Sequence, residues 1–152
     1  MTTIAQDRIE RQIALSAPRK RVWQALTNAA EFGEWFRIGL EGSFQTGKSI
    51  RGNMKYPGWE HVVVEFTVEK IEPETLFSYR WHPYAIDPDT DYSHEPTTLV
   101  EFHLKDDQGG TLLTVIESGF GKLPASRRDE AFRMNENGWK GQLGNLQKYV
   151  EG

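Results

Sequence analysis

The amino-acid sequence predicts an α+β domain in which helices flank the consecutive strands of an antiparallel sheet. Several segments alternate apolar and polar residues with the period of two that is typical of half-buried strands. Turn-forming residues separate these segments by only a few positions, which favours antiparallel neighbours because a parallel pair needs a crossover of a dozen or more residues. Apolar residues at helical spacing occur over residues 16–36 and from Ser126 to Gly152.

Local patterns predict the N-terminal elements. Residues 7–15, DRIERQIAL, alternate as a strand. Ser16 is the predicted N-cap of a first helix, since a proline stands near the first helical position and apolar residues follow at helical spacing. Residues 29–36, AAEFGEWF, predict a second short helix.

Five further segments have strand patterns and are separated by turns such as YPG, EPE and DDQGG. They cover residues 49–55, 59–71, 75–81, 97–105 and 111–118. Three of them each present one apolar face, and these faces consist of Val62, Val64, Phe66 and Val68, of Phe77, Tyr79 and Trp81, and of Val100, Phe102 and Leu104. Hairpins of this kind predict a continuous antiparallel sheet.

Residues 42–49, GSFQTGKS, match the GxxxxGK(S/T) pattern of phosphate-binding loops. Such a loop needs a helix directly after its serine, because the helix N-terminus directs backbone N–H groups at the phosphates. Here a strand pattern containing Gly52 and Pro57 follows Ser49. We therefore interpret Gly47 and Lys48 as a turn before a strand and expect no nucleotide binding.

A long C-terminal helix is predicted to begin at Ser126 as its N-cap. Its apolar stripe consists of Phe132, Trp139, Leu143, Leu146 and Val150. At about 100° per residue, Arg128, Asn135 and Glu136 lie within about 60° of Trp139 on the same stripe. We expect this helix to lie across the sheet with an inner face that is apolar in its C-terminal half and mixed in its N-terminal half.

Composition excludes several classes of function. The chain has 152 residues, no cysteine and a formal net charge of -4. This length suits a single domain over residues 1–152. The absence of cysteine excludes thiol nucleophiles and thiolate metal sites, and the absence of a long basic run argues against nucleic acid or a membrane surface as a partner. With no apolar signal core and no membrane-spanning stretch, we expect a cytoplasmic protein.

Three segments resemble one branch of the START-like, or SRPBCC, helix-grip superfamily, which also includes polyketide cyclases and lipid-transfer domains. They are SAPRKRVWQALTNAAEFGEWF at 16–36, ESGF at 117–120 and NENGW at 135–139. The branch is named after the activator of the heat-shock-protein-ninety ATPase, and the match spans nearly the whole chain. The resemblance implies a seven-stranded antiparallel sheet curled round the last helix, two short helices between the first and second strands, and a cavity between sheet and helix.

The apolar faces and the helix stripe provide the candidate lining of such a cavity. The candidate ligand-binding residues are Trp35, Phe36, Met54, Val64, Phe66, Phe77, Tyr79, Trp81, Phe102, Phe132, Asn135, Glu136, Trp139 and Leu143. The alternative for the aromatic members is plain core packing. Glu136 and Glu117 are the candidate catalytic residues, because a carboxyl group beside an apolar cavity has a raised pKa and can transfer protons. The alternative for both is a position at the rim, in contact with solvent.

Residues 81–96 form a long loop for a hairpin, and such loops often carry function or act as lids. Asp87, Asp89 and Asp91 resemble the start of a calcium loop, but Tyr92 stands where that loop needs glycine and Thr98 where it needs glutamate. No other metal-binding spacing occurs, so we expect neither a metal nor a cofactor.

Three functions are compatible with the sequence. The first is binding of a hydrophobic, aromatic or lipid-like small molecule between the sheet and the last helix. The second is a cyclase or hydratase activity in which an inward carboxylate such as Glu136 transfers a proton. The third is a co-chaperone-like partnership with a heat-shock ATPase, which only the branch name suggests. Homodimer formation is left open.

Overall fold

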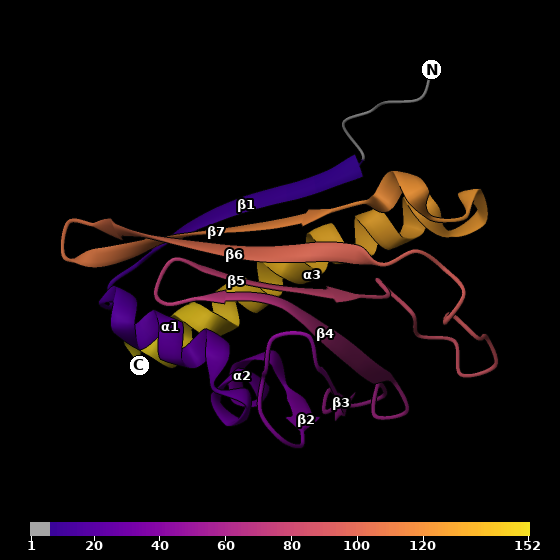
Figure 1. The fold of residues 1–152 in the computed structure, drawn as a ribbon, viewed down its shortest axis with the longest axis horizontal. Helices are drawn as coiled ribbons and strands as arrows, with labels where there is room; N and C mark the ends of the chain where they lie inside the picture. Colours follow the sequence, from indigo (N-terminus) through magenta and orange to yellow (C-terminus); the bar gives the residue numbers. More distant parts are fainter. Residues whose placement is uncertain (1–6) are drawn as a thin grey trace.

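The computed structural model describes residues 7–152, which form a seven-stranded antiparallel sheet with a long C-terminal helix across it (Figure 1). The predicted helix-grip fold is thereby confirmed. The strands are β1 (Arg8–Leu15), β2 (Ile38–Leu40), β3 (Ser49–Met54), β4 (Val63–Glu72), β5 (Leu76–Trp81), β6 (Thr98–Asp107) and β7 (Gly110–Ser118). The helices are α1 (Arg19–Thr27), α2 (Ala29–Phe36), the short 3₁₀ helix η2 (Phe120–Lys122) and α3 (Ala125–Glu151). The predicted domain range also includes residues 1–6, which lie outside the described residues.

The strand order is β1-β7-β6-β5-β4-β3-β2. Strands β2 to β7 are therefore sequential antiparallel neighbours, as the short turns predict, and β1 pairs with the last strand at the opposite edge from β2. A register shift between Val68 and Lys70 places a bulge in β4 opposite β5. A bulge bends a strand and increases its twist, so it helps the sheet to curve round α3.

Strand β2 has no counterpart among the strands predicted from alternation. Its three residues pair with the end of β3, where Gly39 lies opposite Asn53 and Leu40 opposite Gly52. A Cβ atom on Gly52 would stand 2.1 Å from the carbonyl oxygen of Gly39, so this close approach of two backbones needs glycine. Three residues are too few to show a period, which is why the pattern did not reveal the strand.

Both predicted N-caps are wrong by two positions. Helix α1 has Pro18 at its N-cap and α3 has Pro124, and neither helix has a side-chain cap. Ser16 instead precedes α1 and its backbone N–H donates to a carboxylate oxygen of Glu151 at 2.7 Å. Ser126 lies inside the first turn of α3. Proline fixes the backbone angle at a helix start without offering a side-chain acceptor, and here it replaces the serine cap.

The segment with the phosphate-loop pattern is a turn that leads into a strand. Gly47 has a φ of 80°, its N–H donates to the carbonyl of Val68 at 2.8 Å, and β3 begins at Ser49. No helix follows the lysine of the pattern, since β3 runs to Met54. The backbone therefore lacks the geometry that cradles phosphates.

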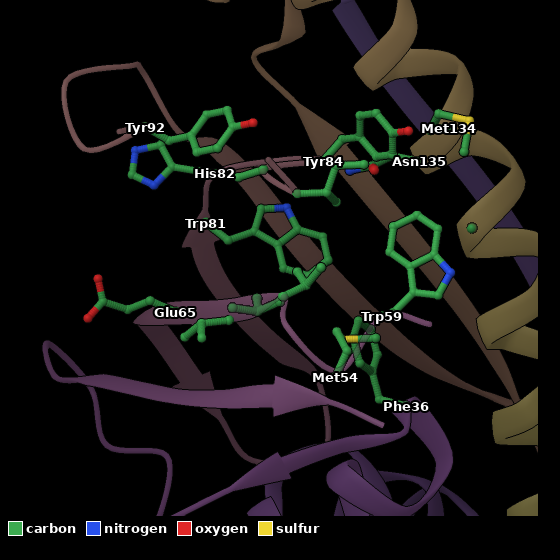
Figure 2. Close-up of a pocket in the computed structure, with 16 residues that line it drawn as sticks. Phe36, Met54, Trp59, Glu65, Trp81, His82, Tyr84, Tyr92, Met134 and Asn135 are labelled. Atoms are coloured by element: carbon green, nitrogen blue, oxygen red, sulfur yellow. The ribbon is translucent and has the colours of Figure 1, made fainter. Parts of the chain in front are cut away.

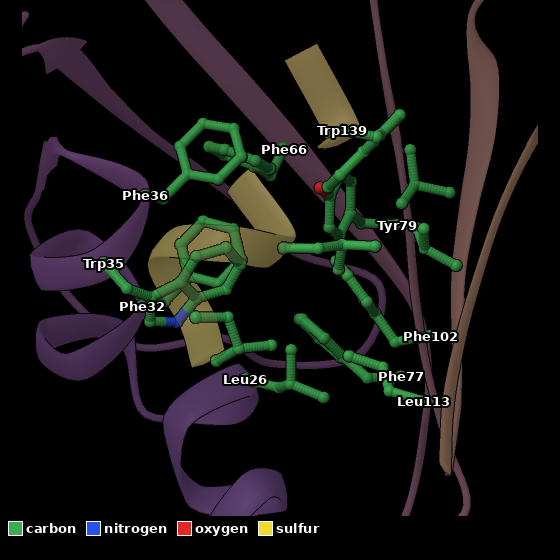
Figure 3. Packing of buried hydrophobic residues seen from close by; sticks show 14 of the residues in the cluster. Leu26, Phe32, Trp35, Phe36, Phe66, Phe77, Tyr79, Phe102, Leu113 and Trp139 are labelled. Carbon is green, nitrogen blue, oxygen red and sulfur yellow. The ribbon is translucent and has the colours of Figure 1, made fainter. Parts of the chain in front are cut away.

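The core is a continuous aromatic cluster between the helices and the sheet (Figure 3). Phe32 of α2 contacts Phe66 of β4 edge-on, with the ring centroids 5.6 Å apart, and Phe66 contacts Tyr79 of β5 at 4.9 Å. The series continues through Trp81 to Trp139 of α3, whose rings stack at 5.8 Å. Edge-on and stacked aromatic pairs stabilise a core beyond their buried area. This packing holds α3 against β5 at the place where the candidate site lies.

Candidate functional site: an apolar cavity and a buried carboxylate

A cavity of about 350 Å³ lies between the turn that precedes β4, the β5–β6 loop and α3. Figure 2 shows aromatic and methionine side chains from these elements converging on it. Its lining consists of Phe36, Met54, Trp59, Val62, Val63, Val64, Glu65, Trp81, His82, Tyr84, Ala85, Ile86, Tyr92, Met134, Asn135 and Gly138. The volume is in the range of small-molecule sites, and such sites combine an apolar lining with a few polar groups.

The open side of the cavity carries two large apolar residues. Trp59 is 38% exposed and Val63 is 49% exposed, and these are the exposed large hydrophobic residues among residues 7–152. A second, smaller cavity of about 120 Å³ shares Phe36, Trp81, Asn135 and Gly138 with the first. These shared residues mark the place where the two cavities adjoin.

Glu117 lies directly behind this junction and is completely buried. Strand β7 alternates so that Leu113, Val115 and Glu117 all face inward, and the strand therefore places a carboxylate where a third apolar side chain would be expected. No ion pair to Glu117 is present within residues 7–152. A buried charge without a counter-ion is costly unless hydrogen bonds compensate it.

Four neutral side chains donate hydrogen bonds to Glu117. Oε2 accepts from the indole Nε1 of Trp81 at 2.7 Å and from the hydroxyl of Thr98 at 2.6 Å. Oε1 accepts from the indole Nε1 of Trp139 at 2.8 Å. The Asn135 Nδ2 atom lies 3.0 Å from Oε1 and 3.1 Å from Oε2. The carboxylate thus connects β5, β6, β7 and α3, and every one of its partners offers an N–H or O–H group.

Burial raises the pKa of Glu117 above its ordinary value, and these hydrogen bonds, which favour the ionised form, offset only part of that effect. Tyr79, which is also fully buried, has its pKa raised well above the ordinary value, first by desolvation and then by the negative charge of Glu117. The hydroxyl of Tyr79 has no hydrogen-bond partner within the described part of the chain. The site therefore places one carboxyl group and one phenol, both desolvated, beside an apolar cavity.

Arg127, near the start of α3, holds the β5–β6 loop over the cavity. Its guanidinium donates from Nε and NH2 to one carboxylate oxygen of Glu95 at 3.0 and 2.8 Å, and from NH1 to the carbonyl of Tyr84 at 3.0 Å. The same guanidinium lies 4.8 Å from the ring centroid of Tyr92. Since Tyr84 and Tyr92 both line the cavity, this contact network positions two of its walls.

The acidic residues of the loop organise its own backbone. Asp87 accepts from the N–H of Asp89 at 2.9 Å and from the hydroxyl of Thr90 at 2.7 Å, and these bonds lower its pKa. No group of three or more His, Asp or Glu side chains that could hold a metal occurs within residues 7–152. Across the same residues, no helix is long and apolar enough to cross a bilayer.

The family described as "Activator of Hsp90 ATPase homolog 1-like protein" matches residues 16–151. The chain belongs to this family. No curated protein sequence matches it.

Solved structures similar to this family member include the crystal structure of DynU16, from the dynemicin biosynthetic locus, which is 25% identical with a TM-score of 0.74. The chain spans 47% of DynU16, and the match covers 95% of the chain. The protein MLL2253 from Mesorhizobium loti is 23% identical with a TM-score of 0.75, over 95% of this chain and 96% of that one. The Aha1 dimer from Colwellia psychrerythraea is 18% identical with a TM-score of 0.72, over 95% and 96%. These likenesses support the helix-grip fold.

In this family member, five of the predicted binding residues line the cavity of about 350 Å³, namely Phe36, Met54, Val64, Trp81 and Asn135. Trp139 lines the smaller cavity. The others line neither of the two and pack in the core or beside it, namely Trp35, Phe66, Phe77, Tyr79, Phe102, Phe132 and Leu143. These residues belong to the apolar cluster or pack against it, and their role in binding a ligand stays a prediction.

The prediction that Glu136 points inward is also wrong, because its side chain is exposed. At about 100° per residue, Glu136 lies about 60° to one side of Trp139, whereas Asn135 lies about 40° to the other side, where the cavities adjoin. Arg128, expected on the same stripe, donates to the carbonyl of Leu123 at 2.9 Å. Of the two candidate carboxylates, Glu117 is buried next to the cavities and Glu136 is exposed.

Most lining residues that the sequence patterns missed come from loops. Trp59 belongs to the turn before β4, and Tyr84 and Tyr92 belong to the loop that was predicted to carry function or act as a lid. The length of that loop was the available signal, together with its two tyrosines. Met134 and Gly138 of α3 gave no signal, because they lie outside the apolar stripe.

Proposed function

We propose that this protein binds a hydrophobic small molecule with a flat ring in the cavity between the β5–β6 loop, the turn before β4 and α3. The observation that carries the proposal is the lining itself. Trp59, Trp81, Tyr84 and Tyr92 approach from three separate segments, and the neighbouring methionines are adaptable in shape. Aromatic walls with two flexible methionine side chains suit a planar apolar ligand better than an alkyl chain.

The relatives support a small-molecule function. DynU16 comes from a biosynthetic locus for dynemicin, so a protein of this fold at 25% identity is encoded beside small-molecule synthesis. Because the chain spans only about half of DynU16, we propose the ligand of this protein from its own cavity.

An enzyme of the cyclase or hydratase kind is the second candidate. Glu117, buried without a cation beside the cavity, favours it, since burial raises its pKa and a carboxyl group with a raised pKa can act as a general acid. Glu117 does not line either cavity, and Asn135 stands between it and the ligand space. Binding therefore fits the geometry better than direct proton transfer from Glu117.

The co-chaperone function rests on the family description, and a homodimer rests on the Aha1 dimer among the similar structures. Neither is argued from an observation on this chain's own residues. Size-exclusion chromatography with light scattering checks the homodimer, and pull-down of an Hsp90-type ATPase checks the partnership.

Two glycines of α3 permit a matched test of binding. A Cβ at Gly138 or at Gly141 meets no atom within 4 Å, and of the two only Gly138 lines a cavity. Gly138→Leu should fill ligand space, while Gly141→Leu makes the same change in helix propensity on the exposed side. The probe is 2-methylnaphthalene, and its affinity is measured by isothermal titration calorimetry. We expect Gly138→Leu to weaken binding at least about tenfold, which corresponds to about 1.4 kcal/mol, and Gly141→Leu to leave the affinity unchanged. Equal affinities in the two variants would remove the cavity as the binding site.

A further inference from the structure

Asn135 occupies the polar position at the junction of the two cavities. It lines both of them together with the apolar groups Phe36, Trp81 and Gly138. Figure 2 shows its side chain among those that line the cavity. A ligand ring that reaches this junction therefore meets the amide of Asn135 among apolar groups.

Glu117 determines which end of this amide a ligand can use. The Nδ2 atom of Asn135 is within hydrogen-bond distance of both carboxylate oxygens, at 3.0 and 3.1 Å. A carboxylate only accepts hydrogen bonds when ionised, so turning the Asn135 oxygen toward it would bring acceptors together. The amide nitrogen is thereby committed to Glu117, and the amide oxygen accepts no hydrogen bond from residues 7–152.

The other partners of Glu117 reinforce this orientation. The indoles of Trp81 and Trp139 and the hydroxyl of Thr98 already donate to its two oxygens. With both oxygens occupied by donors, the carboxylate holds Asn135 in one orientation as part of a network that spans four elements. Thr98 and Glu117 are buried, so solvent does not compete for these bonds.

We infer that Glu117 is a positioning residue that turns the Asn135 carbonyl oxygen toward the ligand, and that the ligand is an aromatic molecule carrying a hydroxyl or N–H donor. This inference rests on the proposed binding function and specifies its ligand class. A donor on the ring satisfies the amide oxygen, whereas a ring without one leaves that oxygen desolvated and unpaired. Selectivity between such ligands is large where a site contains a polar group that would be left unpaired.

The test compares 2-naphthol with 2-methylnaphthalene, which have the same rings and differ by a hydroxyl in place of a methyl group. The quantity measured by calorimetry at neutral pH is the ratio of their affinities, since this ratio cancels the contribution of the rings. In Asn135→Leu and in Glu117→Gln, we expect the preference for 2-naphthol to fall about 2- to 10-fold relative to wild type, the amount that one hydrogen bond supplies. Asn137→Leu, an exposed asparagine of the same helix, is the matched control and should keep the wild-type ratio.

If the ratio of the two affinities is the same in Asn135→Leu as in wild type, the inference is overturned. The proposed function is still supported in that case if Gly138→Leu weakens binding of 2-methylnaphthalene. Failure of both probes to bind refutes the proposed function itself. If Glu117→Gln does not fold, the side-chain NH2 resonances of Asn135 in wild type replace it as the readout. They should shift no more with 2-naphthol than with 2-methylnaphthalene, because the nitrogen stays on Glu117, and a selective shift of the NH2 resonances would contradict the assigned orientation.

Discussion

Replacing Thr98 by valine removes one hydroxyl from the Glu117 network and keeps the size and branching of the side chain. The hydroxyl donates to Glu117 Oε2 at 2.6 Å, and both residues are fully buried. A hydrogen bond to a charged group contributes about 1.5–3 kcal/mol to stability, and its loss leaves the carboxylate more poorly compensated. We expect Thr98→Val to lower the free energy of unfolding by about this amount at neutral pH.

Thr111 offers a matched control. It is equally buried, but its hydroxyl donates to the backbone carbonyl of Ala17 at 2.8 Å, which is a bond between neutral groups. Thr111→Val should therefore cost only about 0.5–1.5 kcal/mol, and this cost should not depend on the ionisation of Glu117.

The two variants should also differ in their pH dependence. Removing a donor that favours ionised Glu117 raises its folded-state pKa further, so the folded variant binds more protons than the unfolded chain over a wider pH range. Stability then falls more steeply with rising pH, and the difference between wild type and Thr98→Val grows as pH passes through the folded pKa of Glu117. Urea unfolding followed by circular dichroism at several pH values measures this difference. A cost no larger than that of Thr111→Val and constant with pH would show that Glu117 is not held as a buried carboxylate by these donors.

Three further predictions concern the same region. Because its folded pKa is raised, Glu117 contributes most to stability below the pKa of an unfolded glutamate, about 4.3, and this contribution falls as pH rises through the folded pKa. In urea titrations at several pH values, the free energy of unfolding of Glu117→Gln should not show this fall. A pH profile identical to that of wild type would contradict the raised pKa of Glu117. Tyr79→Phe removes a buried hydroxyl without a hydrogen-bond partner and should leave the melting temperature unchanged or raise it. Tyr149→Phe loses a 3.0 Å hydrogen bond to Glu31 and should lower the melting temperature. A large drop in the melting temperature of Tyr79→Phe would reveal a partner for its hydroxyl. Arg127→Lys cannot keep the guanidinium contacts to Glu95 and Tyr84, so amide hydrogen exchange in residues 82–97 should become faster. The control Arg133→Lys, at an exposed position, should leave this exchange unchanged. Equal exchange rates in the two variants would show that other contacts hold the β5–β6 loop.

The strands and the architecture were largely predictable because alternation and turn residues depend on local sequence. The predicted strand at 111–118 lies within β7, and the predicted helix at 29–36 coincides with α2. The three residues of β2 were not predictable, since they form a strand only because Gly52 lets its backbone approach that of Gly39 closely. Helix starts were misplaced because a proline and a serine close together both fit a helix start.

The site was predictable only in part, and the two candidate carboxylates show why. Glu117 follows Leu113 and Val115 on the inward face of β7, so the period of two could have placed it inside, although the sequence alone also left a rim position open. Glu136 lies at the margin of a helical stripe, where a rotation of some tens of degrees separates solvent from cavity. The walls supplied by Trp59 and Tyr92 depend on how two loops meet, which local periodicity does not encode.

The most direct measurement of ligand binding uses the two methionines of the cavity. Met54 of β3 and Met134 of α3 both contribute side chains to its lining and come from elements far apart in the sequence. In protein labelled with ¹³C at the methionine methyl groups, a bound aromatic probe such as 2-methylnaphthalene should show intermolecular nuclear Overhauser effects to both residues. Contacts from the ring protons to both methyl groups are the predicted result. A probe that binds but contacts neither methyl group would place the ligand elsewhere and contradict the proposed site.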